Sequence, residues 1–265
     1  MNSYVAWQIK SRIVYGIKSY SRFKIHSPFV FELIEKVLKD KSKHSDFSFI
    51  EKYRKSLSRS RTVIETVDFG ERSGNKQYLS TFEKLGPLVT KRTLKKAQGR
   101  ALYRLNQYFK PKTILEFGTA AGISAAYLKL PVPDATMITM EGCASLADVA
   151  SNTLSKLQVK NTDIRIGDFE VTLPKVLENL DTLDMVFFDG NHRFEPTVEY
   201  FNQCVEKANE NSYFVFDDIH WSPGMEKAWK TIKKDPRVIV SIDLFWMGIV
   251  FFRKGMPKQD FVIRY

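Results

Sequence analysis

The sequence contains little cysteine, since only Cys143 and Cys204 occur among its 265 residues. They are far apart and neither belongs to a CxxC pair, so neither a disulfide framework nor a cysteine metal site is indicated. Long apolar runs are also missing. The first twenty residues lack the apolar core of a secretory signal, and the run 244–252 is too short to span a bilayer. With 43% hydrophobic residues to build a core, we expect a globular, cytoplasmic protein.

Acidic residues are scarce in the first part of the chain. Residues 1–110 carry 24 Lys and Arg against 9 Asp and Glu, whereas residues 111–265 carry 17 against 21. A basic region of this kind can bind nucleic acid, anionic lipid or an acidic substrate, and it can equally be an ordinary solvated surface of helices. Both interpretations stay open at this point.

The chain also lacks the Gly-x-Gly-x-x-Gly pattern of dinucleotide binders and the lysine of a Walker motif. In their place, residues 112–128 read KTILEFGTAAGISAAYL, an apolar segment followed by Gly118 and Gly122 and then by a second apolar segment. A strand that leads through a glycine turn into a helix lets the backbone approach a ligand closely. This stretch therefore predicts a site for a nucleotide-like cofactor that is not held through its pyrophosphate.

Strand and helix patterns alternate from residue 112 onward, which predicts an α/β fold with a doubly wound, mostly parallel sheet. Only two residues separate the last two predicted strands, so the final strand must pair antiparallel. The predicted strands are 112–117, 136–140, 163–167, 184–189, 212–217, 238–243 and 246–252. The predicted helices between them are 121–129, 145–158, 171–179, 195–209 and 223–234.

Before residue 111 the pattern is helical. Val5, Ile9, Ile13 and Ile17 recur at helical spacing, and Ser27 precedes Pro28 as a cap precedes a first helical residue. Residues 49–57 and 88–108 are also predicted as helical, and the polar stretch 68–75 as a loop. We expect two domains: a helical region at 1–110 for substrate binding or oligomerisation, and a cofactor-binding domain at 111–265.

Acidic residues recur where the predicted strands end, at the edge where doubly wound sheets bind ligands. They are Glu116, Glu141, Asp168, Asp189, Asp217 and Asp218. Glu141 follows Glu116 by 25 residues, close to the interval at which an acid binds ribose hydroxyls. Asp168 then suits an adenine amino group. No Arg or Lys stands directly beside Glu141 to receive a 2′-phosphate, which disfavours NADP and leaves NAD possible.

Several ordered motifs resemble those of the class I S-adenosylmethionine-dependent methyltransferases, and in particular of the small catechol-type and sugar-type O-methyltransferases. LEFGTAAG is similar to the first motif, FFDGNH to the fourth and VFDDIHW to the next, and KAQGRALYRL upstream resembles a family helix. The resemblance covers about 160 residues and implies that family's seven-stranded, Rossmann-like fold. It implies S-adenosylmethionine as cofactor, bound by Glu116, Gly118, Thr119, Gly122, Ser124, Glu141, Gly142, Asp168, Phe169 and Asp189.

The resemblance also places Asp189, Asp217 and Asp218 on the ligand positions of the metal-dependent members. Three oxygen ligands would suit Mg²⁺ or another divalent cation. Asp218 stands where the family usually has Asn, and a third carboxylate would raise the negative charge of the site. Asp189 is expected to be catalytic, and His192 and His220 follow the acidic strand ends, where either could remove a proton from a hydroxyl.

The leading hypothesis is therefore an O-methyltransferase acting on a small-molecule or glycan-like hydroxyl, with or without the assistance of magnesium. A second hypothesis is an RNA or DNA methyltransferase whose basic N-terminal region holds the nucleic acid. A third is a non-catalytic scaffold whose helix at residues 4–24 docks on a membrane or a protein. We expect that helix to pack over the active site or against a twin subunit in a homodimer.

Overall fold

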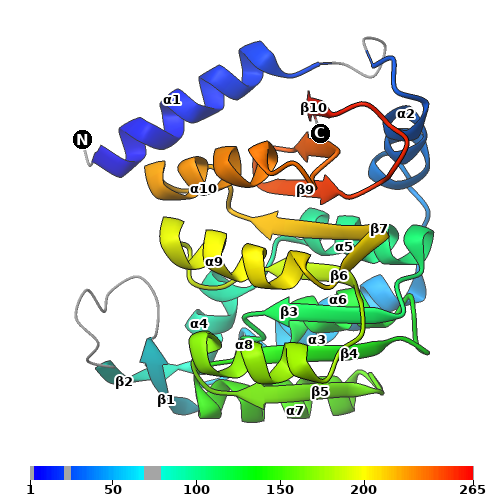
Figure 1. Cartoon of the computed structure of the whole chain (residues 1–265). Coiled ribbons are helices and arrows are strands. Elements are labelled where there is room, and N and C mark those ends of the chain that lie inside the picture. The colour runs from blue at the N-terminus through cyan, green and yellow to red at the C-terminus, as the bar shows by residue number, and fades with distance from the viewer. Residues whose placement is uncertain (1–2, 21–24, 69–78, 265) are drawn as a thin grey trace. The chain divides into compact units, whose positions relative to one another are not determined.

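The computed structural model describes residues 3–20, 25–68 and 79–264 (Figure 1). The predicted loop at 68–75 lies, from residue 69 on, outside the described residues. Contacts divide the chain into two compact units. The first unit is Met1–Ile34 together with Leu177–Tyr265, and the second unit is Glu35–Val176.

The second unit is built on three parallel strands in the order β3-β4-β5. They are β3 (Thr113–Phe117), β4 (Thr136–Glu141) and β5 (Thr162–Ile166). The helices are α3 (Ser45–Leu57), α4 (Leu85–Arg92), α5 (Lys96–Phe109), α6 (Ile123–Lys129), α7 (Ala144–Lys156) and most of α8 (Phe169–Glu178). An antiparallel hairpin of β1 (Val63–Asp68) and β2 (Leu79–Lys84) completes it. Because β3, β4 and β5 run in one direction, their carboxyl ends lie at one edge.

Close packing of α5 on α6 depends on a glycine of the predicted Gln-Gly motif. A Cβ atom at Gly99 would lie 2.5 Å from the ring of Tyr127, so a larger residue could not fit between the two helices. Gln98 accepts a hydrogen bond from the backbone N–H of Lys95 (2.7 Å) and so caps the start of α5. The resulting cluster is buried and joins α3, α5 and α6 through Phe47, Ile50, Tyr103, Ile123, Ala126, Tyr127 and Leu157.

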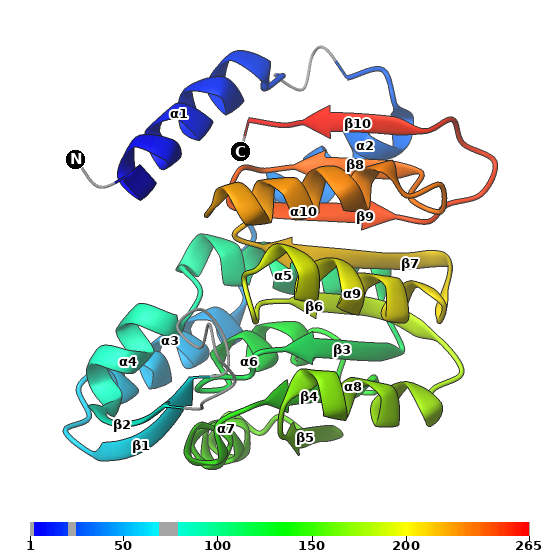
Figure 2. The same ribbon diagram turned by 60° about the vertical axis from the view of Figure 1, so that its left-hand side comes forward.

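The first unit contains five strands in the order β10-β8-β9-β7-β6. They are β6 (Leu183–Phe188), β7 (Ala208–Asp217), β8 (Val240–Asp243), β9 (Met247–Phe251) and β10 (Gln259–Val262). β9 is antiparallel to both β7 and β8, whereas β6 is parallel to β7 and β10 to β8. The helices are α1 (Ser3–Lys18), α2 (Pro28–Leu33), α9 (Phe194–Val205) and α10 (Pro223–Lys234). The π-helical turn η2 (Ile34–Leu38) follows α2 and belongs, from Glu35 on, to the second unit. Figure 2 shows α9 and α10 on one face of these strands.

The N-terminal helix is tied to the C-terminal end of the chain. The Tyr15 hydroxyl donates to the carbonyl of Ile263, and the Tyr20 N–H donates to the carbonyl of Val262 (2.8 Å). The guanidinium of Arg264 donates in turn to the carbonyl of Gly16 (3.1 Å). The last of these bonds reaches a carbonyl group in the final turn of α1, where the helix itself supplies no further N–H partners.

All seven predicted strands are present, and the antiparallel pairing of the last of them is confirmed. The predicted α/β class with a mostly parallel sheet is confirmed as well. Three features differ. β10 adds an eighth strand to β3–β9, the hairpin β1–β2 interrupts the mainly helical region before residue 110, and the predicted helix 88–108 is two helices with a break at Thr93. Ser27 caps α2 as predicted, since its Oγ accepts from the Val30 N–H.

None of the helices in the described part of the chain has both the length and the apolar composition that crossing a bilayer requires.

Candidate functional site

The turn after β3 takes a backbone conformation that depends on glycine. Gly118 and Gly122 have φ values of 87° and 78°, in the left-handed region that disfavours side chains. A Cβ atom at Gly122 would also lie 3.2 Å from Cα of Ala150 in α7. The turn is pinned to β4, because the N–H groups of Gly118 and Thr119 both donate to the carbonyl of Met140. The predicted cofactor turn is thus a rigid loop at the carboxyl edge of the second unit.

Glu116 places a carboxyl group with no solvent exposure directly before this turn. Its Oε2 accepts a hydrogen bond from the Thr139 hydroxyl (2.6 Å), and Ser124 also donates to the carboxyl. Burial nevertheless raises the pKa of Glu116 to about 7, because loss of hydration outweighs these two bonds. Its Oε1 is buried without a hydrogen-bond partner among the described residues. Such an atom is expected where a ligand supplies the missing partner.

Glu141 braces the turn from the end of β4. Its Oε2 accepts from the N–H of Ala120 (2.8 Å) and its Oε1 from the N–H of Cys143 (3.0 Å), and Gly142 contributes a further backbone hydrogen bond. Ala120 has a positive φ of 45°, and the bond from Glu141 stabilises that conformation. Burial raises the pKa of Glu141, and these backbone bonds oppose the shift. Glu141 therefore orders the loop, a role that adds to the predicted ribose binding.

The fold also brings a positive charge to Glu141 that the sequence did not reveal. Arg92, at the end of α4, lowers the pKa of Glu141 electrostatically against the effect of burial. No Lys or Arg stands beside Glu141 in the sequence. A residue 49 positions upstream could be found only from the packing of α4.

Asp168 and Phe169 follow β5 at the same edge. Asp168 Oδ1 accepts from the Glu170 N–H (3.0 Å) and so caps α8. The ring of Phe169 meets that of Phe117 edge to face, with centroids 5.5 Å apart. The structure therefore brings the predicted cofactor residues of the second unit to one edge of its strands. They are Glu116, Gly118, Thr119, Gly122, Ser124, Glu141, Gly142, Asp168 and Phe169.

The first unit has an acidic edge of its own. β7 and β8 are both antiparallel to β9, so Asp217 and Asp243 end their strands on the same side, where Asp189 follows β6. Asp217 and Asp243 are both buried. Asp243 was not predicted, although it ends its strand as the six predicted acids do. The strand-end rule would have identified it had it been applied to the last hairpin.

Asp243 is the hydrogen-bond partner of His220. Asp243 Oδ2 lies 2.8 Å from Nε2 of His220, while its Oδ1 accepts from the Phe245 N–H (2.8 Å). The imidazole also stacks on the ring of Phe245, with centroids 5.4 Å apart. Nδ1 of His220 is buried without a hydrogen-bond partner among the described residues. A carboxylate on one nitrogen orients the ring and leaves the other nitrogen for a substrate.

His192 is more accessible and less firmly held. Its Nε2 lies 3.7 Å from Oδ1 of Asp189, beyond hydrogen-bond distance, and 28% of its side chain is exposed. The two predicted catalytic histidines thus differ in kind. His220 is fixed by a hydrogen bond to a buried acid, whereas His192 can adjust its position.

The predicted metal site is not supported by this arrangement. Across residues 3–20, 25–68 and 79–264, no three His, Cys, Asp or Glu side chains are grouped so that they could hold a metal ion. Asp217 ends β7, while Asp218 turns into the left-handed region (φ 53°) and its N–H donates to the carbonyl of Trp246 (2.9 Å). A role for a divalent cation at Asp189, Asp217 and Asp218 therefore stays a prediction.

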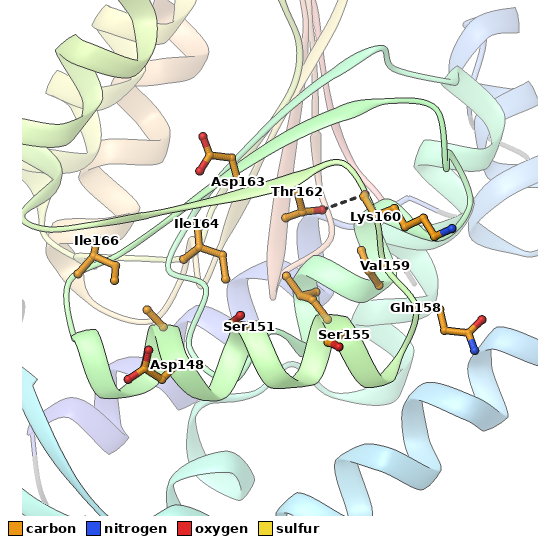
Figure 3. A pocket seen from close by; sticks show the side chains of 12 residues that line it. Asp148, Ser151, Ser155, Gln158, Val159, Lys160, Thr162, Asp163, Ile164 and Ile166 are labelled. Carbon is orange, nitrogen blue, oxygen red and sulfur yellow. Dashed lines mark hydrogen bonds between the residues drawn. The ribbon is translucent and has the colours of Figure 1, made fainter.

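An open hollow of about 800 Å³ lies elsewhere in the second unit, between α7 and β5 (Figure 3). Its lining includes Ser151, Ser155 and Ile164, and Figure 3 shows these side chains directed into the space between the helix and the strand. None of the predicted cofactor residues lines this hollow.

The turn after β3 lies within a segment that is similar in sequence to known proteins. Residues 115–219 match the family model described as a methyltransferase domain. A catechol O-methyltransferase of Niastella koreensis is 30% identical over 125 residues, which are 46% of this chain and 56% of that protein. The chain thus spans about half the length of this curated relative.

Solved structures of O-methyltransferases resemble the fold over most of the chain. The O-methyltransferase of Bacillus cereus in complex with SAH has a TM-score of 0.57 at 15% identity, covering 84% of this chain and 97% of that one. The O-methyltransferase TomG of Streptomyces achromogenes in complex with SAM, which is involved in tomaymycin synthesis, has a TM-score of 0.57 at 18% identity and covers 84% and 95%. The fold predicted from the motifs is confirmed: the chain has the class I methyltransferase fold of these structures, and its residues 115–219 match the model of a methyltransferase domain.

Proposed function

We propose that this protein is an S-adenosylmethionine-dependent O-methyltransferase that acts on a hydroxyl group of a small or glycan-like molecule. The observation that carries the proposal is the buried Glu116 carboxyl, whose Oε1 has no hydrogen-bond partner among the described residues and stands before the rigid turn 118–122. That turn lies within the segment that matches the methyltransferase domain. The neighbours with bound SAM or SAH support the choice of cofactor.

The second unit would hold the cofactor. Glu116, Ser124 and the backbone of the turn 118–122 would face its methionine part, since the turn lacks side chains at Gly118 and Gly122. Glu141 and Gly142 would lie against the ribose, and Asp168 and Phe169 against the adenine. When bound, S-adenosylmethionine supplies an electrophilic methyl group on a positively charged sulfur. Glu116 with Glu141 would favour that positive charge in an environment where charge interactions are strong.

The first unit would supply the base. His220 is oriented by Asp243, and its buried Nδ1 has no hydrogen-bond partner among the described residues, so this nitrogen would take the proton from the acceptor hydroxyl. His192 and Asp189 would bind and position the acceptor. Deprotonating the hydroxyl makes the oxygen a better nucleophile, and the remaining requirement is to place it in line with the methyl group.

Isothermal titration calorimetry with S-adenosylmethionine and with S-adenosylhomocysteine tests the cofactor assignment. Both compounds should bind saturably with one site per chain, and Glu116→Gln should weaken binding. Glu178→Gln, an exposed glutamate at the end of α8, is the matched control and should bind as the wild type does. If neither compound binds the wild type, the proposed function is wrong.

Nucleic acid remains the second candidate acceptor because residues 1–110 carry 24 Lys and Arg against 9 Asp and Glu. Binding driven by phosphate contacts weakens steeply with salt. A gel-shift titration with RNA and with DNA at low and high salt decides the matter. No shift at low salt, or a shift that salt does not change, removes this candidate.

A further inference from the structure

The helix α1 turns its apolar residues away from the rest of the first unit. Ile9, Ile13 and Ile17 are four residues apart and so share one face, and they are 50%, 58% and 80% exposed. Ser11 and Tyr15, from the opposite face, make the contacts inward. Figures 1 and 2 both show α1 at the periphery of the first unit, next to the C-terminal end of the chain.

This orientation is the reverse of the usual one for a surface helix, whose apolar stripe faces the core. The position of α1 is set by polar and aromatic contacts. Tyr15 packs on Phe245 with ring centroids 5.2 Å apart, and the Arg12 guanidinium lies 5.7 Å from the centroid of the same ring. Because these contacts hold the helix without the isoleucines, the exposed stripe is available to something outside the chain.

The charge around the stripe indicates what that partner is. Lys10, Arg12 and Lys18 are exposed on the same helix, and residues 1–31 contain five Lys and Arg with no Asp or Glu. A second copy of the helix would bring the same positive charges together and would be repelled. An anionic lipid surface is complementary to both the basic side chains and the exposed isoleucines. Its head groups attract the basic side chains, and its acyl region accommodates the isoleucines.

We propose that α1 docks the protein on an anionic lipid surface through Ile9, Ile13 and Ile17, with Lys10 beside this face against the lipid head groups. The helix lies in the plane of the surface and does not cross the bilayer. A 16-residue helix with exposed basic side chains has the dimensions and polarity of such interfacial helices. The docking is independent of cofactor binding by the second unit.

Flotation of the full-length protein with vesicles tests this proposal. The protein should float with vesicles that contain phosphatidylglycerol, and much less with phosphatidylcholine alone. High salt should reduce flotation because surface attraction is screened. Replacing Lys10 by Gln should lower the partition coefficient roughly fivefold, because one basic charge near the surface is removed.

The variant Ile13→Asp with Ile17→Asp should abolish flotation while calorimetry shows unchanged S-adenosylmethionine binding. Phe82→Asp is the matched control, since Phe82 is 75% exposed on β2 and should leave flotation unchanged. Two results overturn the proposal. One is a wild type that floats with no vesicle, and the other is a wild-type dimer, measured by light scattering, that becomes monomeric in the isoleucine variant and ignores vesicles.

Discussion

The carboxyl group of Glu116 couples the stability of the fold to pH. Its ordinary pKa is 4.5, and burial raises the pKa to about 7. Between these values the folded chain keeps a proton that the unfolded chain has released. The free energy of unfolding therefore falls as pH rises through this interval, by about 3 kcal/mol at most. A buried group that weakens the fold at neutral pH is expected where binding, and not stability, is its purpose.

Replacing Glu116 by Gln should remove this dependence. The amide fills the same volume and does not titrate, so the variant should gain stability relative to the wild type as pH rises from 5 to 8, by up to about 3 kcal/mol. Denaturant unfolding at several pH values measures the difference between the two proteins. A constant difference across this range would show that Glu116 does not titrate there. Glu178→Gln should show no pH-dependent difference.

The hydrogen bond between His220 and Asp243 predicts different roles for the two histidines: His220 acts as the base and His192 binds the acceptor. His220→Gln should lower kcat by roughly 10²–10⁴-fold if it is the base, whereas His192→Gln should mainly raise KM for the acceptor. Asp243→Asn should lower kcat less and alter the pH–rate profile, because the ring loses the charge that orients it. Steady-state kinetics with a methyl acceptor measures each effect. A larger loss of kcat in His192→Gln would reverse the assignment.

Among the elements, the segment from β3 to α6 shows how a local pattern can determine a site. The glycines of the turn could be recognised in the sequence because only a few residues tolerate positive φ. The acids at strand ends could be placed because parallel strands share an edge. The brace from Glu141 to Ala120 and the proximity of Arg92 could not be predicted, because both depend on packing between segments far apart in the chain.

The elements that were missed are those with the weakest local signals. β10 has four residues and β1 and β2 carry polar side chains, so no apolar run marks them. The break between α4 and α5 at Thr93 interrupts an apolar pattern that continues across it. The ligand set of Asp189, Asp217 and Asp218 stays a prediction. Asp218 has a positive φ of 53°, a feature that its place next to Asp217 in the sequence does not reveal.

Two glycines with nearly the same backbone angle allow the turn to be tested as an element. Gly122 has φ 78° and would crowd Ala150, whereas Gly255 has φ 77° and open space around it. Gly122→Ala and Gly255→Ala should each destabilise the fold by about 1 kcal/mol through strain. Only Gly122→Ala should weaken S-adenosylmethionine binding, because its Cβ pushes the turn away from α7. Calorimetry compares the two variants, and equal affinities would contradict the role of the turn.

On the scale of the whole molecule, the division into two units separates the proposed cofactor residues from the proposed base. Glu116, Glu141 and Asp168 belong to the second unit, and Asp189 and His220 to the first. Stabilisation by a ligand follows from mass action and needs no change of structure.

S-adenosylmethionine at 100 times its Kd should raise the free energy of unfolding by about 2.7 kcal/mol. Hydrogen exchange should slow at residues 118–122 and 141–143, where the turn and its brace lie. Differential scanning calorimetry and exchange measured by mass spectrometry provide the two readouts. Protection confined to segments outside the second unit would place the cofactor elsewhere.

The bonds from α1 to residues 262–264 have a consequence for the time course of synthesis. The Tyr15 hydroxyl and its acceptor at Ile263 are separated by 248 positions in the chain. At about 5–20 residues per second, translation takes roughly 10–50 s to produce the acceptor after the helix has been made. During that interval Ile9, Ile13 and Ile17 belong to a nascent helix with neither its C-terminal anchor nor a folded protein beneath it. A ribosome-bound chain would thus reach a lipid surface before residues 111–265 are complete.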